Sequence, residues 1–130
     1  MFSKTLNANM EVAALEGSRA SVIGGAPAAA VVFVPEVHAL TDADPRVIAL
    51  EKQVGQASGS TRAELRHQLD ELRASVAAEK RGEVAAEFDR IHSVQRAKEM
   101  GSIDVILPIE ELRPYLVAAI ERGKARVEVG

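Results

Sequence analysis

Residues 44 to 76 read DPRVIALEKQVGQASGSTRAELRHQLDELRASV, and this stretch decides the fold. It opens with Asp44-Pro45, a pair typical of a helix N-cap followed by proline at the first helical position. Thr61 is followed three residues later by a glutamate, which matches a capping box and predicts the start of a second helix. Between these signals, residues 55 to 60 are rich in the glycine and serine of turns. The stretch therefore predicts two helices joined by a short loop.

Apolar residues recur every three or four positions in both predicted helices, which places them on one side of each helix. Because the loop is short, the two helices should be antiparallel neighbours whose apolar sides meet in a narrow seam. The residues of this seam are Val47, Leu50, Val54, Leu65, Leu69, Leu72 and Val76. The charged residues of the stretch are interspersed in sign, as on a solvated face. We expect an antiparallel α-hairpin over residues 44 to 80.

The sequence before the hairpin has the order of an α/β protein. Residues 21 to 23 (Ser-Val-Ile) are short, apolar and β-branched, which favours a buried strand. Gly24-Gly25 then permits a tight turn, and Pro27 fits the first turn of a helix, where its missing N–H costs nothing. Strand, glycine turn and helix together predict α/β layering.

The sequence after the hairpin predicts three helices and a strand. A first helical face comprises Val84, Phe88 and Ile91. A short helix from Val94 to Met100 should end at Gly101, a natural left-handed residue. Residues 102 to 107 (Ser-Ile-Asp-Val-Ile-Leu) predict a strand, and Pro108 with the glutamates after it marks a last helix. The predicted buried side of that helix comprises Leu112, Leu116, Ala119 and Ile120. Residues 124 to 130 are expected to be a frayed tail.

The composition argues against several classes of protein. A chain of 130 residues makes one ordinary domain at most. Its formal charge of −3, from 16 basic and 19 acidic residues, argues against nucleic acid as the main partner. No apolar run approaches the roughly 20 residues of a membrane span, and the absence of cysteine excludes thiolate chemistry. We expect a cytoplasmic protein whose aromatic-poor interior suits closely packed helices or a surface covered by a partner.

The residues themselves indicate little catalytic chemistry. The serines at 18, 21 and 93 lack the Gly-x-Ser-x-Gly elbow of a hydrolase, and His38, His67 and His92 share no metal-ligand spacing. We expect His67 to be solvated and His92 to cap or pack against a helix. Two interpretations of Gly24-Gly25 stay open. Their N–H groups could polarise a carbonyl or hold an anion, or the glycines could simply let a strand turn into a helix.

Two segments of the sequence are similar to one known family. They are residues 20 to 30 (ASVIGGAPAAA) and residues 92 to 108 (HSVQRAKEMGSIDVILP). Both resemble the carboxyltransferase domain of biotin-dependent acyl-CoA carboxylases, within the crotonase-like superfamily. The first resembles the apolar strand and Gly-Ala-rich helix start of its second crotonase-like half. The second resembles the final signature of the family, a short helix ending at glycine and a strand closed by proline. Leu112-Arg113 and the apolar helix after them resemble its terminal helix. The hairpin resembles the longer version found in carboxylases whose modules are fused in one polypeptide.

The resemblance implies a fold, an activity and a site. Residues 1 to 130 would form a partial, helix-rich crotonase-like α/β fold with the hairpin inserted at 44 to 80. The implied reaction transfers a carboxyl group from carboxybiotin to an acyl-CoA, with biotin as cofactor, no metal and no catalytic side chain from this chain. Gly24, Gly25 and Ala26 would form a wall of the biotin pocket. The implied partners are a biotin carboxyl carrier or other carboxylase subunits, the acyl-CoA substrate, and further copies of the chain.

The family also uses backbone N–H groups to polarise the thioester and biotin carbonyls. These groups lie in the first half and in a loop that precedes the segment at Met1–Lys4. We therefore expect the chain to be inactive alone, since losing one such donor costs roughly 10²–10³ in rate. The alternative is a non-catalytic helical interaction or oligomerisation module associated with a carboxylase. A third hypothesis, an independent crotonase-type enzyme, is weaker because one oxyanion hole requires the loop outside this chain.

Overall fold

The structure is a computed structural model that describes residues 7–129, so the segment at Met1–Lys4 lies outside the described residues. The chain divides into two compact units. The helical unit comprises residues 22–91, and the terminal unit comprises residues 7–21 together with 92–129. Within residues 7–129, no helix combines the length and apolar character needed to cross a membrane.

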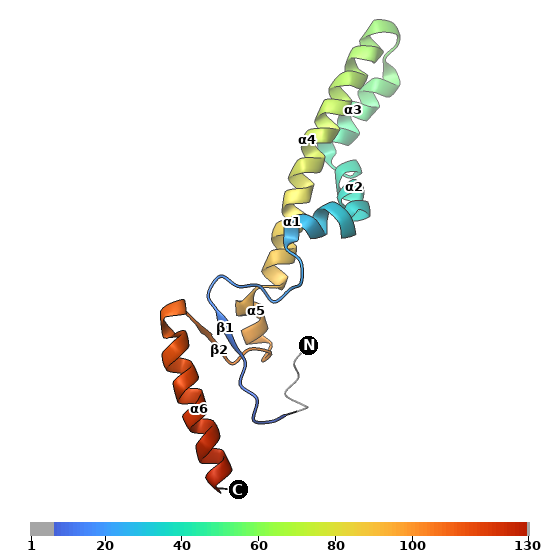
Figure 1. Ribbon diagram of the computed structural model, residues 1–130. Helices are drawn as coiled ribbons and strands as arrows, with labels where there is room; N and C mark the ends of the chain where they lie inside the picture. The colour runs from blue at the N-terminus through green and yellow to red at the C-terminus, as the bar shows by residue number, and fades with distance from the viewer. Residues whose placement is uncertain (1–6, 130) are drawn as a thin grey trace. The chain divides into compact units, whose positions relative to one another are not determined.

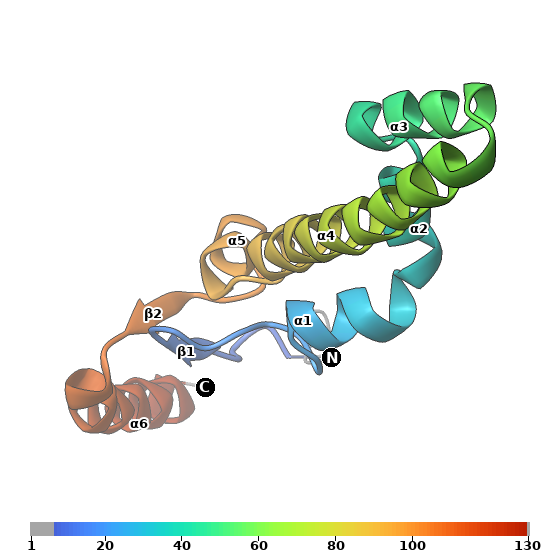
Figure 2. The ribbon, with the colours of Figure 1, turned by 90° about the horizontal axis from the view of Figure 1, so that it is seen from above.

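The helical unit is organised around one long helix, α4 (Gly59–Ile91). Three helices and one π-helical turn precede it, namely α1 (Gly25–Pro27), η1 (Ala28–Val32), α2 (Val34–Asp42) and α3 (Pro45–Gln56). Each of these segments packs against α4. Figures 1 and 2 show α3 and α2 side by side with successive stretches of α4, and α1 near its C-terminal part.

The hairpin seam is confirmed in full. Its centre is a buried cluster of Val47, Val54, Leu69 and Val76, and Leu50, Leu65 and Leu72 pack against it. Val47 and Val76 are fully buried. Asp44 caps α3 as predicted, because its carboxylate accepts a hydrogen bond of 2.9 Å from the N–H of Arg46. The apolar periodicity therefore selects the hairpin part of the core, while Ala28, Ala29 and Val37 extend the buried core of the helical unit beyond the seam.

The boundaries of the hairpin differ from the prediction. The loop is only residues 57–58, because α3 extends through Gln56 and α4 begins at Gly59, where φ is +61°. Thr61 is therefore already inside α4, and the predicted capping box does not open the helix. The helix also continues through Gly82 to Ile91, so the separate helix predicted around Val84 is wrong. An interior glycine costs only about 0.5–1 kcal/mol, too little to end a helix that neighbours support along its length.

The terminal unit contains a two-stranded sheet and two helices. Its elements are β1 (Ala13–Leu15), α5 (Val94–Glu99), β2 (Val105–Leu107), the 3₁₀ turn η2 (Ile109–Glu111) and α6 (Leu112–Val129). The strands pair in parallel, with Ala13 opposite Val105 and Leu15 opposite Leu107 (Figures 1 and 2). Asp104 extends this pairing, because its N–H donates to the Val12 carbonyl at 2.8 Å and its carboxylate accepts from the Val12 N–H at 2.8 Å. The fold class is thus α/β in the broad sense, helix-rich with a small parallel sheet.

One predicted strand is wrong and the other is confirmed. Residues 21–23 form a bend in which Val22 is fully exposed, so they are not a buried strand. The strand of this region is instead β1, which lies earlier in the chain and pairs with β2. The strand predicted at residues 102–107 is confirmed in its C-terminal half, as β2. A short β-branched run does not make a strand without a partner edge to pair with.

The two helices of the terminal unit differ in how well they match the prediction. The helix α5 is confirmed, with the Ser93 hydroxyl accepting from the Arg96 N–H at 3.1 Å and Gly101 at a φ of +77°. No residue of α6 is buried, and the predicted inward-facing Leu116 and Ile120 are 51% and 60% exposed. The predicted frayed tail is also wrong over residues 124–129, which continue α6.

Candidate functional site

The residues of the predicted pocket wall lie where the helical unit begins. Gly24 is the extended N-cap residue of α1, Gly25 is buried, and Ala26 is exposed. The N–H of Gly25 donates a hydrogen bond of 2.8 Å to the carboxylate of Asp89, near the end of α4. This N–H is therefore already used within the chain and cannot also polarise a bound carbonyl.

The contact of Gly25 with α4 explains why this position is glycine. A Cβ placed on Gly25 would lie 2.0 Å from the carbonyl oxygen of Ala85 and 2.9 Å from the carboxyl carbon of Asp89. No side chain fits at Gly25, because the nearest atoms belong to the backbone of α4 and cannot move aside. Gly25 fits neither interpretation of the glycine pair, because its N–H is bonded to Asp89 and no strand immediately precedes it. Its lack of a side chain instead lets α1 pack closely against α4.

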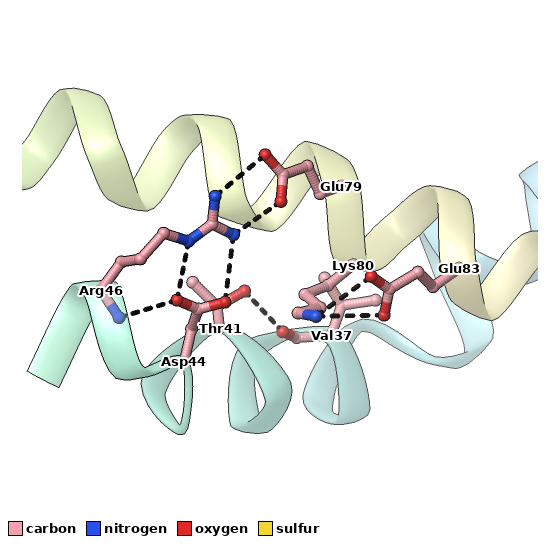
Figure 3. Close-up of polar contacts among 7 residues, drawn as sticks. All are labelled: Val37, Thr41, Asp44, Arg46, Glu79, Lys80 and Glu83. Carbon is pink, nitrogen blue, oxygen red and sulfur yellow. Dashed lines mark hydrogen bonds and ion pairs between the residues drawn. The ribbon is translucent and has the colours of Figure 1, made fainter.

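A charged cluster joins the start of α3 to α4 (Figure 3). The Arg46 guanidinium lies 3.0 and 3.1 Å from the two carboxylate oxygens of Asp44, and 3.3 and 2.6 Å from those of Glu79. Hydrogen bonds from Arg46 hold the pKa of both carboxyl groups below their usual values. Both carboxylates are thus poor general bases, and the cluster acts as a clamp.

Figure 3 also shows two contacts between residues of the same helix, next to this cluster. The hydroxyl of Thr41 donates to the Val37 carbonyl at 2.7 Å within α2, and the Lys80 ammonium lies 3.1 Å from the Glu83 carboxylate within α4. Both contacts lie within single helices and are satisfied internally. They stabilise the helices without presenting a reactive group.

A second cluster, in the terminal unit, fastens the N-terminal segment to α6. The Glu11 carboxylate accepts hydrogen bonds from the Tyr115 hydroxyl at 3.0 Å and from Arg122 at 3.1 and 2.6 Å. Arg126 adds an ion pair to Glu11 at 3.6 Å and donates to the carbonyl of Asn9 at 3.2 Å. Hydrogen bonds from Arg122 and Tyr115 lower the pKa of Glu11 to about 2. Burial and the contact with Glu11 raise the pKa of Tyr115, so neither group is tuned for proton transfer near neutral pH.

A groove between α2 and α4 is the third feature. It consists of two open hollows of about 230 Å³ each that share His38. The first is also lined by Thr41, Asp42, Arg73, Ala74 and Ala77. The second is also lined by Ala29, Ala30, Val34, Val37 and Arg81. In the first hollow Arg73 pairs with Asp42 at 3.3 Å and with Glu51. In the second, neither His38 nor Arg81 has an ion pair among the described residues.

The remaining sequence candidates have structural roles. The side chain of His67 is 76% exposed and lies 3.5 Å from Glu71, as expected for a solvated residue. The His92 carbonyl accepts from the N–H of Ala20 at 2.8 Å, while Ser93 caps α5. Over residues 7–129 no group of three acidic, histidine or cysteine side chains is placed to hold a metal ion.

Sequence reasoning did not find the two clusters or the groove. Glu11 and its partners on α6 lie more than 100 positions apart in the chain, and no local pattern connects them. For the terminal cluster the sequence offers only the spacing of four between Arg122 and Arg126, and for the other cluster the capping role of Asp44. Comparison with known proteins finds no matching family model, curated protein or solved structure.

Proposed function

We propose that this chain is the C-terminal part of the carboxyltransferase domain of a biotin-dependent acyl-CoA carboxylase, and that it functions only together with other parts of that enzyme. The complete enzyme would transfer a carboxyl group from carboxybiotin to an acyl-CoA. The order α5, Gly101, β2, Pro108 and α6 agrees with the final signature of that family. The chain would contribute structure to the domain, with no catalytic side chain of its own.

The observation that carries the proposal is the parallel pairing of β1 with β2. Parallel sheets occur almost only where helices cover both faces, and two strands alone are marginally stable in water. Each strand here has three residues, and the segment connecting them contains the whole helical unit. Such a pair is the expected remnant of a larger sheet, whose further strands would come from the rest of a crotonase-like fold.

Under this proposal, the predicted biotin-pocket wall of Gly24, Gly25 and Ala26 has a smaller role than the resemblance implies. The N–H of Gly25 is donated to Asp89, and the space at its Cα is filled by α4. These residues therefore do not fit as hydrogen-bond partners of the biotin ring, and no step of carboxyl transfer is assigned to them. Gly24 and Ala26 can offer only backbone and methyl surface to a neighbouring pocket.

The second candidate is a non-catalytic interaction or oligomerisation module associated with a carboxylase. Exposed aliphatic residues in each unit favour it, since larger exposed apolar patches often mark interaction sites. In α6 these residues are Leu116, Val117, Ile120, Val127 and Val129, and in the helical unit they include Val31, Val32 and Val34. The two candidates agree that a partner covers the exposed residues of α6 and differ in whether the assembly has an active site.

A complementation assay tests the proposal. The purified chain is incubated with malonyl-CoA or methylmalonyl-CoA and biocytin, alone and with a carboxyltransferase subunit truncated before its C-terminal signature. We expect no turnover from either protein alone and measurable turnover from the mixture. Val105→Asp in β2 should abolish the gain, whereas His67→Asp on the solvated face should preserve it. Binding without turnover would favour the interaction module, and no binding would contradict both candidates.

A further inference from the structure

The second hollow of the groove has an apolar floor. Ala29 and Val37, which form this floor, are 1% and 2% exposed, while Ala30 and Val34 lie at its rim. Val31 and Val32, which follow Ala30 in the chain, are 77% and 58% exposed. A hollow of about 230 Å³ is smaller than the roughly 300–1,000 Å³ usual for drug-sized ligands. It suits the side chains of a docking segment better than a free small molecule.

The polar groups of this hollow are two hydrogen-bond donors. The guanidinium of Arg81 projects from α4 and the imidazole of His38 from α2, both exposed and without an ion pair among residues 7–129. No carboxylate lines this hollow. A guanidinium can bind a carboxylate through two parallel hydrogen bonds. The hollow therefore suits a segment in which an aliphatic side chain is followed by carboxylates.

The chain contains such a segment in η2, where an isoleucine is followed by two glutamates. Ile109 is 60% exposed, and the following Glu110 and Glu111 are exposed with no ion pair in the described part of the chain. Pro108 precedes them, and its carbonyl accepts from the N–H of Glu111 at 3.1 Å. This turn is therefore preformed, which reduces the entropy that docking would cost.

We propose that the second hollow of one copy binds the η2 turn of a second copy of this chain. Ile109 enters the hollow above Ala29 and Val37, and the two glutamates pair with Arg81 and His38. A competing segment at Val127–Val129 is more exposed, at 80% and 90%, but it has one glutamate beside Lys124 and Arg126. Those cations would repel Arg81, so charge complementarity selects η2.

The contact joins two different surfaces, the hollow and the turn. Two copies can exchange it reciprocally in a two-fold dimer, or it can repeat in one direction to give a ring or an extended chain. A dimer or a larger assembly is therefore expected. The contact uses only surfaces of this chain and is independent of the proposed carboxylase role. Its failure and the failure of that role therefore give different results in the two experiments.

Sedimentation velocity of the full chain tests the contact. Contacts smaller than about 1,200 Å² are usually weak, so assembly is expected at protein concentrations on the order of 100 µM. Arg81→Glu should weaken association more than about tenfold, and so should the double change Glu110→Arg with Glu111→Arg, because each places like charges together. An equimolar mixture of the two variants should assemble again, since each groove then meets a turn of opposite charge.

Arg66→Glu, an exposed arginine of α4 remote from the hollow, is the control and should assemble like the unmodified chain. Circular dichroism verifies that each variant is folded, and glutamine replacements at the same positions substitute for any variant that is not. A monomer at every concentration would overturn the proposal. So would unchanged assembly in either charge-reversed variant, or a mixture that fails to assemble.

Discussion

Replacing Gly25 by alanine tests how the helical unit is held together. The new Cβ would lie 2.0 Å from the Ala85 carbonyl oxygen and 2.8 Å from its carbon, well inside van der Waals contact. Because both atoms belong to the backbone of α4, the clash can be relieved only by moving α1 away. That movement would lengthen the hydrogen bond from the Gly25 N–H to Asp89, which is now 2.8 Å.

The expected loss of stability in Gly25→Ala follows from the clash and from the weakened hydrogen bond. Overpacking a tight contact costs about 1–3 kcal/mol, and weakening a hydrogen bond to a charged group costs about 1.5–3 kcal/mol. The two costs overlap, since one displacement causes both, so we expect the free energy of unfolding to fall by about 2–4 kcal/mol. The matched control is Gly82→Ala, in the middle of α4, where a Cβ would have no neighbour within 4 Å. It should stabilise the protein by about 0.5–1 kcal/mol, because alanine is the better helix former.

Urea unfolding followed by far-ultraviolet circular dichroism measures both variants against the unmodified chain. The two substitutions are chemically identical, so a difference in sign can arise only from their surroundings. If Gly25→Ala is as stable as the unmodified chain, α1 does not lie against α4 as described. The packing explanation for that glycine would then be wrong, and its N–H would again be a candidate for binding a ligand.

Three further predictions address the seam, the terminal cluster and the activity. Leu69→Ala should lower the free energy of unfolding by about 2–4 kcal/mol, whereas the exposed Arg66→Ala should change it by no more than about 0.5 kcal/mol; equal, small effects in urea unfolding would mean that the seam is solvated. Glu11→Gln should lower the melting temperature near neutral pH. Because folding depresses the pKa of Glu11 from 4.5 to about 2, its stabilisation is present above pH 4.5 and is lost as the pH falls through 2. Melting curves should therefore converge for the two proteins at about pH 2, and a constant difference would refute the cluster. The isolated chain should not turn over malonyl-CoA with biocytin, and activity in a highly purified sample would contradict its proposed incompleteness.

The hairpin could be predicted because its information is local. Val47, Leu50 and Val54 repeat at helical spacing within α3, and the same spacing continues in α4. Asp44 and Pro45 mark the start of α3 locally, because the Asp44 carboxylate accepts the Arg46 N–H and proline at the first helical position needs no partner for an N–H. The ends of the two helices are harder to predict, because a glycine does not end a helix that is packed against neighbouring segments. For this reason α4 continues through Gly82.

The sheet and the candidate sites could not be predicted in the same way. Ala13 and Val105 pair across 92 positions, and an Ala-Ala-Leu strand lacks the β-branched residues that signal one. The contact of Glu11 with Arg122 depends on the same long-range folding. The apolar pattern of residues 102–107 predicts β2, which covers residues 105–107. The similar short run at residues 21–23 forms a bend instead.

The two units differ in how completely each buries its own apolar residues, and this difference indicates where the proposed partner would bind. Among the described residues, the buried apolar side chains of the terminal unit are Val94 and Leu107, whereas the helical unit buries a continuous seam. The helix α6 has 18 residues and none is buried, whereas most helical stability in proteins comes from packing of an amphipathic face. The Glu11 cluster, which holds α6 to the N-terminal segment, is exposed to solvent screening. A partner that completes the sheet beside β1 and β2 and covers Leu116 and Ile120 would supply that packing. The proposed carboxyltransferase partner should therefore bind mainly through the terminal unit, which leaves the groove of the helical unit available for a second copy of the chain.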